Sequence, residues 1–187
     1  HSIIMGNMTE RAARAVGANP LLARVAAYYH DIGKMISPQW FIENQERGNN
    51  PHDRLANPEE SARHILSHVT EGERLAREHH LPEEIIHVIR SHHGTMLVTY
   101  FYEQAKSRSL EPDASHYRYG GPIPQTKEAA IIMLADGTEA MVRSLDNPTA
   151  ENIRESIDKI VEARKGEGQL NDSPLTFQDL EAIKRVF

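Results

Sequence analysis

Apolar residues recur along this chain at intervals of three and four, as in amphipathic helices, and no segment alternates convincingly between apolar and polar residues. Asparagine followed by proline, at 19–20 and 57–58, is typical of a helix N-terminus, where the first backbone N–H groups need a side-chain acceptor. The pattern predicts helices over 2–16, 19–35, 57–79, 81–94, 95–106, 126–145, 149–165 and 176–187. We therefore expect an all-α, single-domain protein.

Two segments are predicted to be irregular. Residues 36–56 form a polar connection rich in Asn, Pro and Gly, and residues 108–125 contain enough Pro and Gly to form a surface loop. A loop of that length inside a compact domain is often functional. His116 lies within it, where the loop could close over a pocket.

The composition fits one globular domain, since 39% of the 187 residues are hydrophobic and 26% are charged. No apolar run is long enough to cross a bilayer. The chain begins at His1 without an initiator methionine, so we expect residues 1–187 to be a domain excised from a longer protein, whose missing flank could carry a membrane anchor. A net charge of −6 without a basic run argues against duplex nucleic acid as a partner. Because cysteine is absent, any metal must have nitrogen and oxygen ligands.

Ionisable residues recur on predicted core-facing positions. Asp136 lies on the apolar stripe of helix 126–145, where a carboxylate is costly unless a cation meets it; Arg143 and a metal are equal candidates. His30 faces the core, and Asp31 follows about 100° further around the helix. Such a pair can flank a site in which the carboxylate bridges two metals, although a chance pair on a helix surface is commoner.

Other histidines divide in the same way. His92 and His93 end the predicted helix 81–94, where they either complement the helix dipole or face a shared pocket. His68 lies nearer than His64 to the middle of an apolar stripe, so we expect His68 to be a ligand and His64 to be solvated. The remaining histidines are predicted to be surface or loop residues: His52, His79, His80, His87 and His116. Six residues are thus predicted to point inward from four helices: His30, Asp31, His68, His92, His93 and Asp136.

The order H…HD…H…HH…D along a helical chain resembles the HD-domain metallophosphohydrolases, with His1 as the leading histidine. A more specific resemblance, over nearly the whole chain, is to the cytoplasmic HD domain of membrane-anchored cyclic di-AMP phosphodiesterases of the PgpH type. The segments that carry it are 29–35, 41–45, 92–95, 122–128, 134–136 and 168–170. Gly137 departs from it, since a bulkier residue is expected there. The branch that cleaves cyclic di-GMP fits poorly, because no Gly-Tyr-Pro element follows the paired histidines.

The resemblance implies an HD-type helical bundle that holds two divalent ions, manganese or iron, about 3.5–4 Å apart. Asp31 and a bridging water would be shared between the ions, and this water, as hydroxide, would attack phosphorus. Lys34 would hold a phosphate, so Asp31 and Lys34 are the expected catalytic residues. One ion would be bound by His1, His30 and Asp136, and the other by His68, His92 and His93.

The implied reaction is hydrolysis of cyclic di-AMP to pApA by a cytoplasmic domain that meets the membrane only through segments outside this chain. Three alternatives stay open: another HD-type phosphohydrolase acting on nucleotides, a di-iron oxygenase, and a non-catalytic nucleotide-binding regulatory domain. A homodimer is compatible with the sequence. Three tyrosines are candidates for stacking on a base, although simple packing is their commoner role: Tyr102, Tyr117 and Tyr119.

Overall fold

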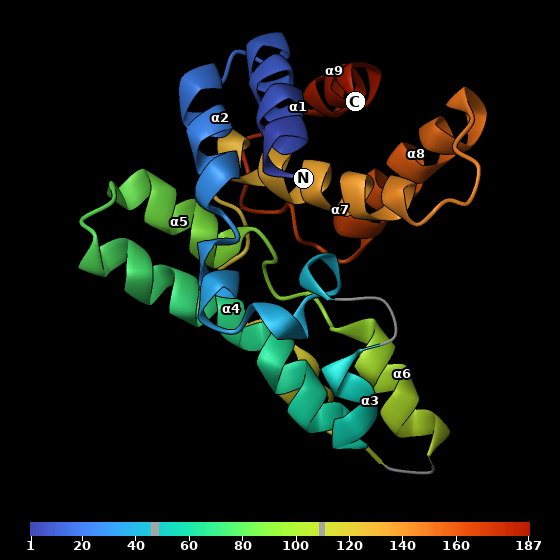
Figure 1. Ribbon diagram of the computed structural model, residues 1–187. Helices are drawn as coiled ribbons and strands as arrows, with labels where there is room; N and C mark the ends of the chain where they lie inside the picture. The colour runs from blue at the N-terminus through green and yellow to red at the C-terminus, as the bar shows by residue number, and fades with distance from the viewer. Residues whose placement is uncertain (46–48, 109–110) are drawn as a thin grey trace.

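The computed structural model describes residues 1–45, 49–108 and 111–187, and the regular elements within these ranges are all helical (Figure 1). The α-helices are α1 (Ser2–Ala15), α2 (Pro20–Tyr29), α3 (Pro51–Leu55), α4 (Pro58–Glu78), α5 (Glu83–Ser91), α6 (Thr99–Ser107), α7 (Lys127–Arg143), α8 (Ala150–Gly166) and α9 (Phe177–Val186). Short 3₁₀ helices are η1 (Ile32–Ile36), η2 (Pro38–Trp40), η3 (Ile42–Asn44) and η4 (Ala114–Tyr117). The all-α prediction is confirmed.

Side-chain caps fix where several helices begin. The Asn19 side chain accepts a hydrogen bond from the backbone N–H of Leu22, and Asn57 accepts from two N–H groups at the start of α4. Thr176 and Asp179 form a reciprocal capping box at α9. These caps satisfy N–H groups that have no partner within the helix, as the sequence predicted.

Helix α7 lies at the centre of the core, in contact with α1, α2, α5 and α8 (Figure 1). Its residues 129–135 are all 1% exposed or less, so the helix is buried around its whole circumference there. Ile132 packs in a cluster with Met5 and Ile89, whereas Leu134 packs with residues of α8 and α9. Any polar side chain of α7 near this stretch therefore lies close to the middle of the molecule.

The predicted helix 19–35 is interrupted. Helix α2 ends at Tyr29, and the chain continues through Asp31 into the 3₁₀ helix η1, which crosses α4. A Cβ atom on Gly33 would collide with the carbonyl oxygen of His68 and would lie 2.5 Å from the backbone nitrogen of Gly72. This backbone-to-backbone contact explains the break, because the chain must turn out of the helix to cross α4.

The predicted helices 81–94 and 95–106 are both shorter than expected. Helix α5 ends at Ser91, and Gly94 then adopts a left-handed φ of 51°. The chain runs extended before α6, where Leu97 and Arg118 form the one isolated β-bridge in the described ranges. That bridge ties the loop 108–125 to the end of α5 and explains why α6 starts only at Thr99.

The two predicted connections also contain short helices. Segment 36–56 includes η2, η3 and α3, and segment 108–125 includes η4; positions 46–48 and 109–110 of these predictions lie outside the described residues. Among the described helices, none has the length and apolarity needed to cross a membrane.

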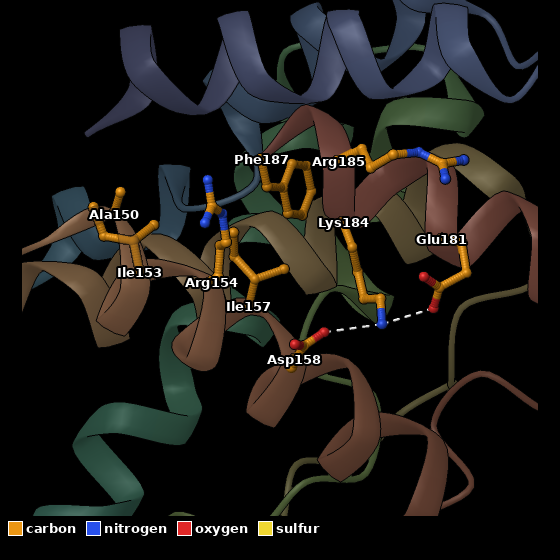
Figure 2. A pocket seen from close by; sticks show the side chains of 9 residues that line it. All are labelled: Ala150, Ile153, Arg154, Ile157, Asp158, Glu181, Lys184, Arg185 and Phe187. Atoms are coloured by element: carbon orange, nitrogen blue, oxygen red, sulfur yellow. Dashed lines mark ion pairs between the residues drawn. The ribbon is translucent and has the colours of Figure 1, made fainter.

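A groove of about 640 Å³ runs between α8 and α9 (Figure 2). Lys184 lies in it, 2.9 Å from Asp158 and 2.6 Å from Glu181. The pair with Asp158 ties the C-terminal helix to α8, whereas Glu181 lies on the same helix as Lys184. The residues that line this groove include none of the predicted ligands, so it is separate from the site that they form.

We expect Gly33→Ala to lower the free energy of unfolding by about 2–3 kcal/mol, because the added methyl group meets backbone atoms that cannot rotate away. Chemical denaturation followed by circular dichroism measures this. Gly166→Ala is the matched control, since no heavy atom lies within 4 Å of the added Cβ atom; its stability should stay constant or rise by up to about 1 kcal/mol. Equal stability of the two variants would show that the crossing of η1 and α4 is not as tight as described.

Candidate metal centre

The structure brings all seven predicted ligands together. His1 caps the start of α1, His30 and Asp31 lie between α2 and η1, and His68 is on α4. His92 and His93 follow α5, and Asp136 is on α7. His30, His68 and His92 are buried, with 2% exposure or less. Five segments far apart in the sequence thus supply one site.

The seven residues form two overlapping groups. The first group is His1, His30, Asp31 and Asp136; the second group is Asp31, His68, His92 and His93. In each group, one ligand atom per residue lies within 4.8 Å of the others. Asp31 is the member that both groups share. This grouping matches the arrangement implied by the family resemblance, while binding of metal by these residues stays a prediction.

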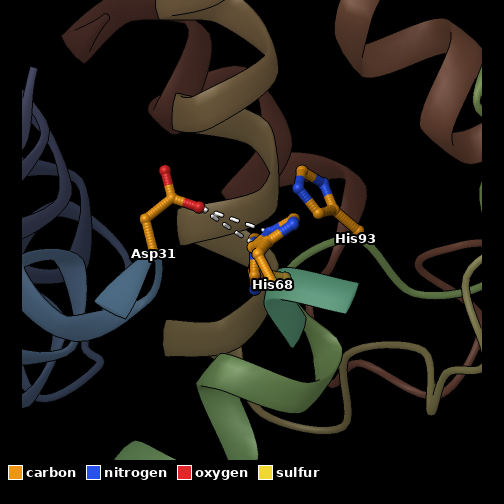
Figure 3. A group of neighbouring side chains, drawn as sticks. Asp31, His68 and His93 are labelled. Atoms are coloured by element: carbon orange, nitrogen blue, oxygen red, sulfur yellow. Dashed lines mark hydrogen bonds and ion pairs between the residues drawn. The ribbon is translucent and has the colours of Figure 1, made fainter. Parts of the chain in front are cut away.

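The two oxygens of Asp31 face different groups. Its Oδ2 atom lies 3.2 Å from His30 Nε2 and 3.8 Å from His1 Nε2. Its Oδ1 atom lies 3.4 Å from His68 Nε2 and 3.7 Å from His92 Nε2. Figure 3 shows Asp31, His68 and His93 pointing toward one another. A carboxylate placed in this way can contribute one oxygen to each of two cations.

Backbone carbonyl groups orient the buried imidazoles. The Nδ1 atoms of His30, His68 and His92 lie 2.8, 2.6 and 2.8 Å from carbonyl oxygens three residues upstream. Since a carbonyl oxygen only accepts, each Nδ1 must be the donor. In a neutral ring the Nε2 atom then carries a free lone pair. This fixed tautomer is typical of histidines that bind metal.

The Nε2 atoms face each other across the site. His68 Nε2 lies 3.2 Å from His92 Nε2, and His1 Nε2 lies 3.5 Å from His30 Nε2. Two lone pairs repel at this distance unless a proton or a cation lies between them. Two nitrogens bound to one metal at about 2.1 Å are expected to be about 3.0–3.4 Å apart. The donor set therefore fits transition-metal ions.

Neighbouring carboxylates and burial have opposite effects on the pKa values of the histidines. Burial opposes the charge of His30, but Asp31 and Asp136 outweigh it and raise the pKa of His30 to about 10. Burial lowers the pKa of His92 to about 3, and it also lowers the pKa of His68 and of His93. At neutral pH the second group thus presents neutral imidazoles, the form that binds metal.

Lys34 also reaches the site. Its Nζ atom lies 2.7 Å from Asp31 Oδ2 and 2.6 Å from Glu43 Oε1. Burial disfavours its charge, but the two carboxylates outweigh this and raise the pKa of Lys34, so it is an ammonium. The segment that carries Glu43 is one of those on which the family resemblance rests.

Glu139 was not predicted as a site residue. Its Oε2 atom accepts a hydrogen bond from His1 Nδ1 at 3.0 Å, which directs His1 Nε2 toward Asp31 and Asp136. Glu139 lies three residues after Asp136 and therefore on the same side of α7. That spacing is the signal in the sequence that would have identified it.

Gln169 fixes the turn that contains the paired histidines. It is 3% exposed, and its side chain accepts from the Thr95 N–H at 2.9 Å and donates to the Thr95 hydroxyl at 3.0 Å. A Cβ atom on Gly94 would collide with the Gln169 amide. The loop after α8 is in this way attached directly behind His92 and His93.

Some of the predictions for the other histidines are wrong. The ring of His64 stacks on Trp40 with centroids 3.8 Å apart, so it is half-buried and only partly solvated. His52 is also half-buried and lies 2.9 Å from the Trp40 carbonyl oxygen, and His87 is half-buried. Aromatic packing under the η2 segment, which the helical pattern did not predict, accounts for His52 and His64. The histidines that are exposed as expected are His79, His80 and His116.

The three tyrosines have different roles. Tyr117 is 2% exposed and packs against Tyr102, so this pair belongs to the core. Tyr119 stacks on His93 with ring centroids 4.3 Å apart. Burial raises the pKa of Tyr119, which keeps it neutral beside the carboxylates. Of the long loop 108–125, Tyr119 is thus the residue that supports a ligand directly.

Comparison with known proteins agrees with this geometry. The family model for the HD domain matches residues 1–141. The chain is 45% identical over 186 residues to the cyclic-di-AMP phosphodiesterase PgpH of Bacillus subtilis (strain 168), covering 100% of this chain and 26% of that protein. The chain thus spans about a quarter of the length of this curated relative.

Two solved structures are similar over the whole chain. The crystal structure of the L. monocytogenes phosphodiesterase PgpH HD domain is 46% identical with a TM-score of 0.94, and this chain covers 87% of it. The crystal structure of that domain in complex with cyclic di-AMP is also 46% identical, with a TM-score of 0.96 and 86% coverage. HD domains are metal-dependent, and this one has a cluster of histidines and aspartates that fits metal. The chain belongs to the HD domain family.

Proposed function

We propose that this domain is a two-metal phosphodiesterase that hydrolyses cyclic di-AMP to the linear dinucleotide pApA. The observation that carries the proposal is the position of Asp31 between two groups of nitrogen and oxygen ligands. The similarity to PgpH, whose HD domain has been solved with cyclic di-AMP, supports the choice of substrate. The ligand set suits manganese or iron.

Each residue then has a defined task. His1, His30 and Asp136 would hold one ion, His68, His92 and His93 would hold the other, and Asp31 would be shared by both. When bound, the metals lower the pKa of a water molecule and polarise the phosphoryl oxygens. Glu139 and the carbonyl groups behind the imidazoles keep the ligands aimed at the ions.

Lys34 is the proposed phosphate ligand. It now neutralises Asp31, and a cation on Asp31 weakens that ion pair by repulsion. Glu43 retains the ammonium at the edge of the site, where it can meet a phosphate oxygen. With metal bound, Asp31 would pair with the ions in place of Lys34, and the Lys34 ammonium would be available to a phosphate oxygen of the substrate.

We further propose that the domain lies in the cytoplasm as part of a longer, membrane-anchored protein. The chain covers 26% of the PgpH sequence, which supports its being part of a longer protein. A cytoplasmic location is consistent with a cyclic dinucleotide substrate. Interaction with a second copy of the chain stays a prediction.

Wild-type protein and Asp31→Asn test the proposal together. The wild type should bind up to two ions per chain, release pApA from cyclic di-AMP, and lose this activity on chelation. Asp31→Asn removes the charge shared by both ions, so it should keep the fold, bind less metal and lose nearly all turnover. Elemental analysis, circular dichroism and chromatography of the products measure these outcomes.

Cyclic di-GMP and an oxygen-dependent assay with iron serve as controls for this experiment. Metal-loaded wild type that binds cyclic di-AMP without cleaving it would support a regulatory domain, and oxygen consumption would support the oxygenase alternative. A folded Asp31→Asn protein with near-normal metal content and turnover would contradict the two-metal site.

His68 and His64 lie four residues apart on α4 and form a matched pair. His68→Ala removes a buried Nε2 that faces Asp31, so turnover should fall by about two orders of magnitude or more. His64→Ala removes only the stacking on Trp40 and should keep most of the turnover while lowering stability by about 1 kcal/mol. Initial rates and melting temperatures measure the two effects. The opposite ranking in activity would invalidate the assignment of ligands on α4.

The stability of the metal-free protein should be greatest near pH 6.5. The pKa of His30 is raised to about 10 from the value of 6.5 expected in the unfolded chain. Its stabilising effect is therefore complete below pH 6.5 and is lost as the pH rises through 10. The pKa of His92 is lowered to about 3, so stability also falls as the pH drops below 6.5. Melting temperatures from pH 4 to 9 measure both limbs. Bound metal would replace the His30 proton, so the stability of metal-loaded protein should not fall between pH 7 and 9. A rise in the stability of metal-free protein over the same range would contradict the role given to His30.

A further inference from the structure

Two cavities adjoin the metal centre, and His93 lines both of them. One, of about 380 Å³, lies between the loop at 96–99 and Tyr119. The other, of about 370 Å³, lies between α7 and α8 and also contacts Asp136. Besides His93, the two cavities share Met96 and Arg164. A ligand bound at the metal centre therefore has two adjacent spaces to fill, with Arg164 at both.

Arg164 is a largely buried cation with unused donors. Its side chain is 17% exposed, and its Nη1 atom lies 3.4 Å from Glu167 Oε2, a long contact to an exposed carboxylate. Its Nε atom is buried, and within the described part of the chain it has no hydrogen-bond partner. A guanidinium group has five N–H donors in a planar fork, so most of this donor capacity is unused within the described part of the chain.

Backbone contacts hold Arg164 in this position. The N–H of Gln169 donates to the Arg164 carbonyl oxygen at 2.9 Å, and Gln169 is also attached to the turn after His93. The end of α8 is therefore fixed relative to the metal ligands. The Arg164 side chain therefore starts from a fixed position beside the two cavities.

Gly137 keeps the second cavity open. It follows Asp136 on α7, and a Cβ atom there would lie 3.2 Å from Ile160 Cγ2 and 3.5 Å from Arg164 Nη2. Glycine inside a helix is less favourable than alanine. Its presence beside a ligand and opposite Arg164 fits a site where space is needed for bound substrate.

We propose that Arg164 binds the phosphate of the cyclic dinucleotide that is not being cleaved, while the two nucleosides occupy the cavities on either side. This inference rests on the proposed function. A cyclic dinucleotide carries two phosphates, and the metals take only one. The second phosphate, brought into a protein of net charge −6, needs its own cation. A guanidinium group matches two phosphate oxygens at once.

Other nearby cations fit this role less well. Lys34 lies beside Asp31 and Glu43 and is already assigned to the phosphate at the metal centre. Arg118 lines only the first cavity, is exposed, and donates to the Thr95 carbonyl oxygen at 3.0 Å. Arg164 is the cation that both cavities share among the described residues.

Steady-state kinetics of Arg164→Gln test the proposal with two substrates. Cyclic di-AMP has a second phosphate, and bis(p-nitrophenyl) phosphate has none. We expect the KM for cyclic di-AMP to rise at least about tenfold with a smaller change in kcat, as for a lost charged hydrogen bond. The rise in KM for the small ester should be much smaller. The metal content of the variant should match that of the wild type. Arg164→Lys, which keeps the charge but not the fork, should be intermediate.

Arg154→Gln is the control, because Arg154 is an exposed arginine on the same helix, away from both cavities. It should behave as the wild type with both substrates. An unchanged KM in Arg164→Gln, or a parallel loss with both substrates, would overturn the role of Arg164. Should Arg164→Gln fail to fold, an unchanged KM in Arg164→Lys would overturn it instead. Wild-type protein that cleaves the small ester but not cyclic di-AMP would contradict the proposed function itself.

Discussion

The structure depends on one electrostatic constraint, which is that the carboxylates of Asp31 and Asp136 lie among buried imidazoles. A buried carboxylate without a cation is costly. In the metal-free protein the His30 imidazolium lowers the pKa of Asp31 and of Asp136 despite their burial, and Lys34 adds to the effect on Asp31. Cations of higher charge satisfy the same carboxylates better. The arrangement that stabilises the fold is thus also one that is suited to binding metal.

The backbone around Asp31 is shaped by this requirement. Asp31 must face two groups of ligands at once. If the helix continued through residue 35, the chain would not turn to cross α4 beside Asp31. The break at Tyr29 and the close crossing of Gly33 and Gly72 place its two oxygens between His30 and His68. The glycine in the segment His-Asp-Ile-Gly-Lys is therefore a packing requirement, while the His and Asp are chemical ones. The same crossing brings Lys34 to the edge of the site.

The sequence predicted the candidate ligands better than the geometry around them. Each signal alone was weak, but several ionisable residues on or beside apolar faces are conspicuous together, so His30, Asp31, His68 and Asp136 could be identified as a set. The break in helix 19–35 could not, because Ile32, Met35 and Ile36 continue the helical spacing and the cause of the break lies in α4. Both Met35 and Ile36 are in fact exposed. Glu139 and Arg164 were overlooked because a single charge on a helix usually faces solvent. Their roles arise from contacts with residues distant in the sequence.

The site also joins parts of the fold that pack separately. The first ligand group comes from α1, α2 and α7, whose apolar side chains form the two clusters around Met5 and Leu134. The second includes His68 of α4, which carries the separate cluster around Phe101. Asp31 belongs to both groups, so metal bound there would link these packing units, in addition to the crossing of η1 and α4 and to α5, which contacts α4 as well as α2 and α7. Positioning of the ions and cohesion of the domain would then have the same physical origin, and a substrate at Arg164 and His93 would bind where these units meet.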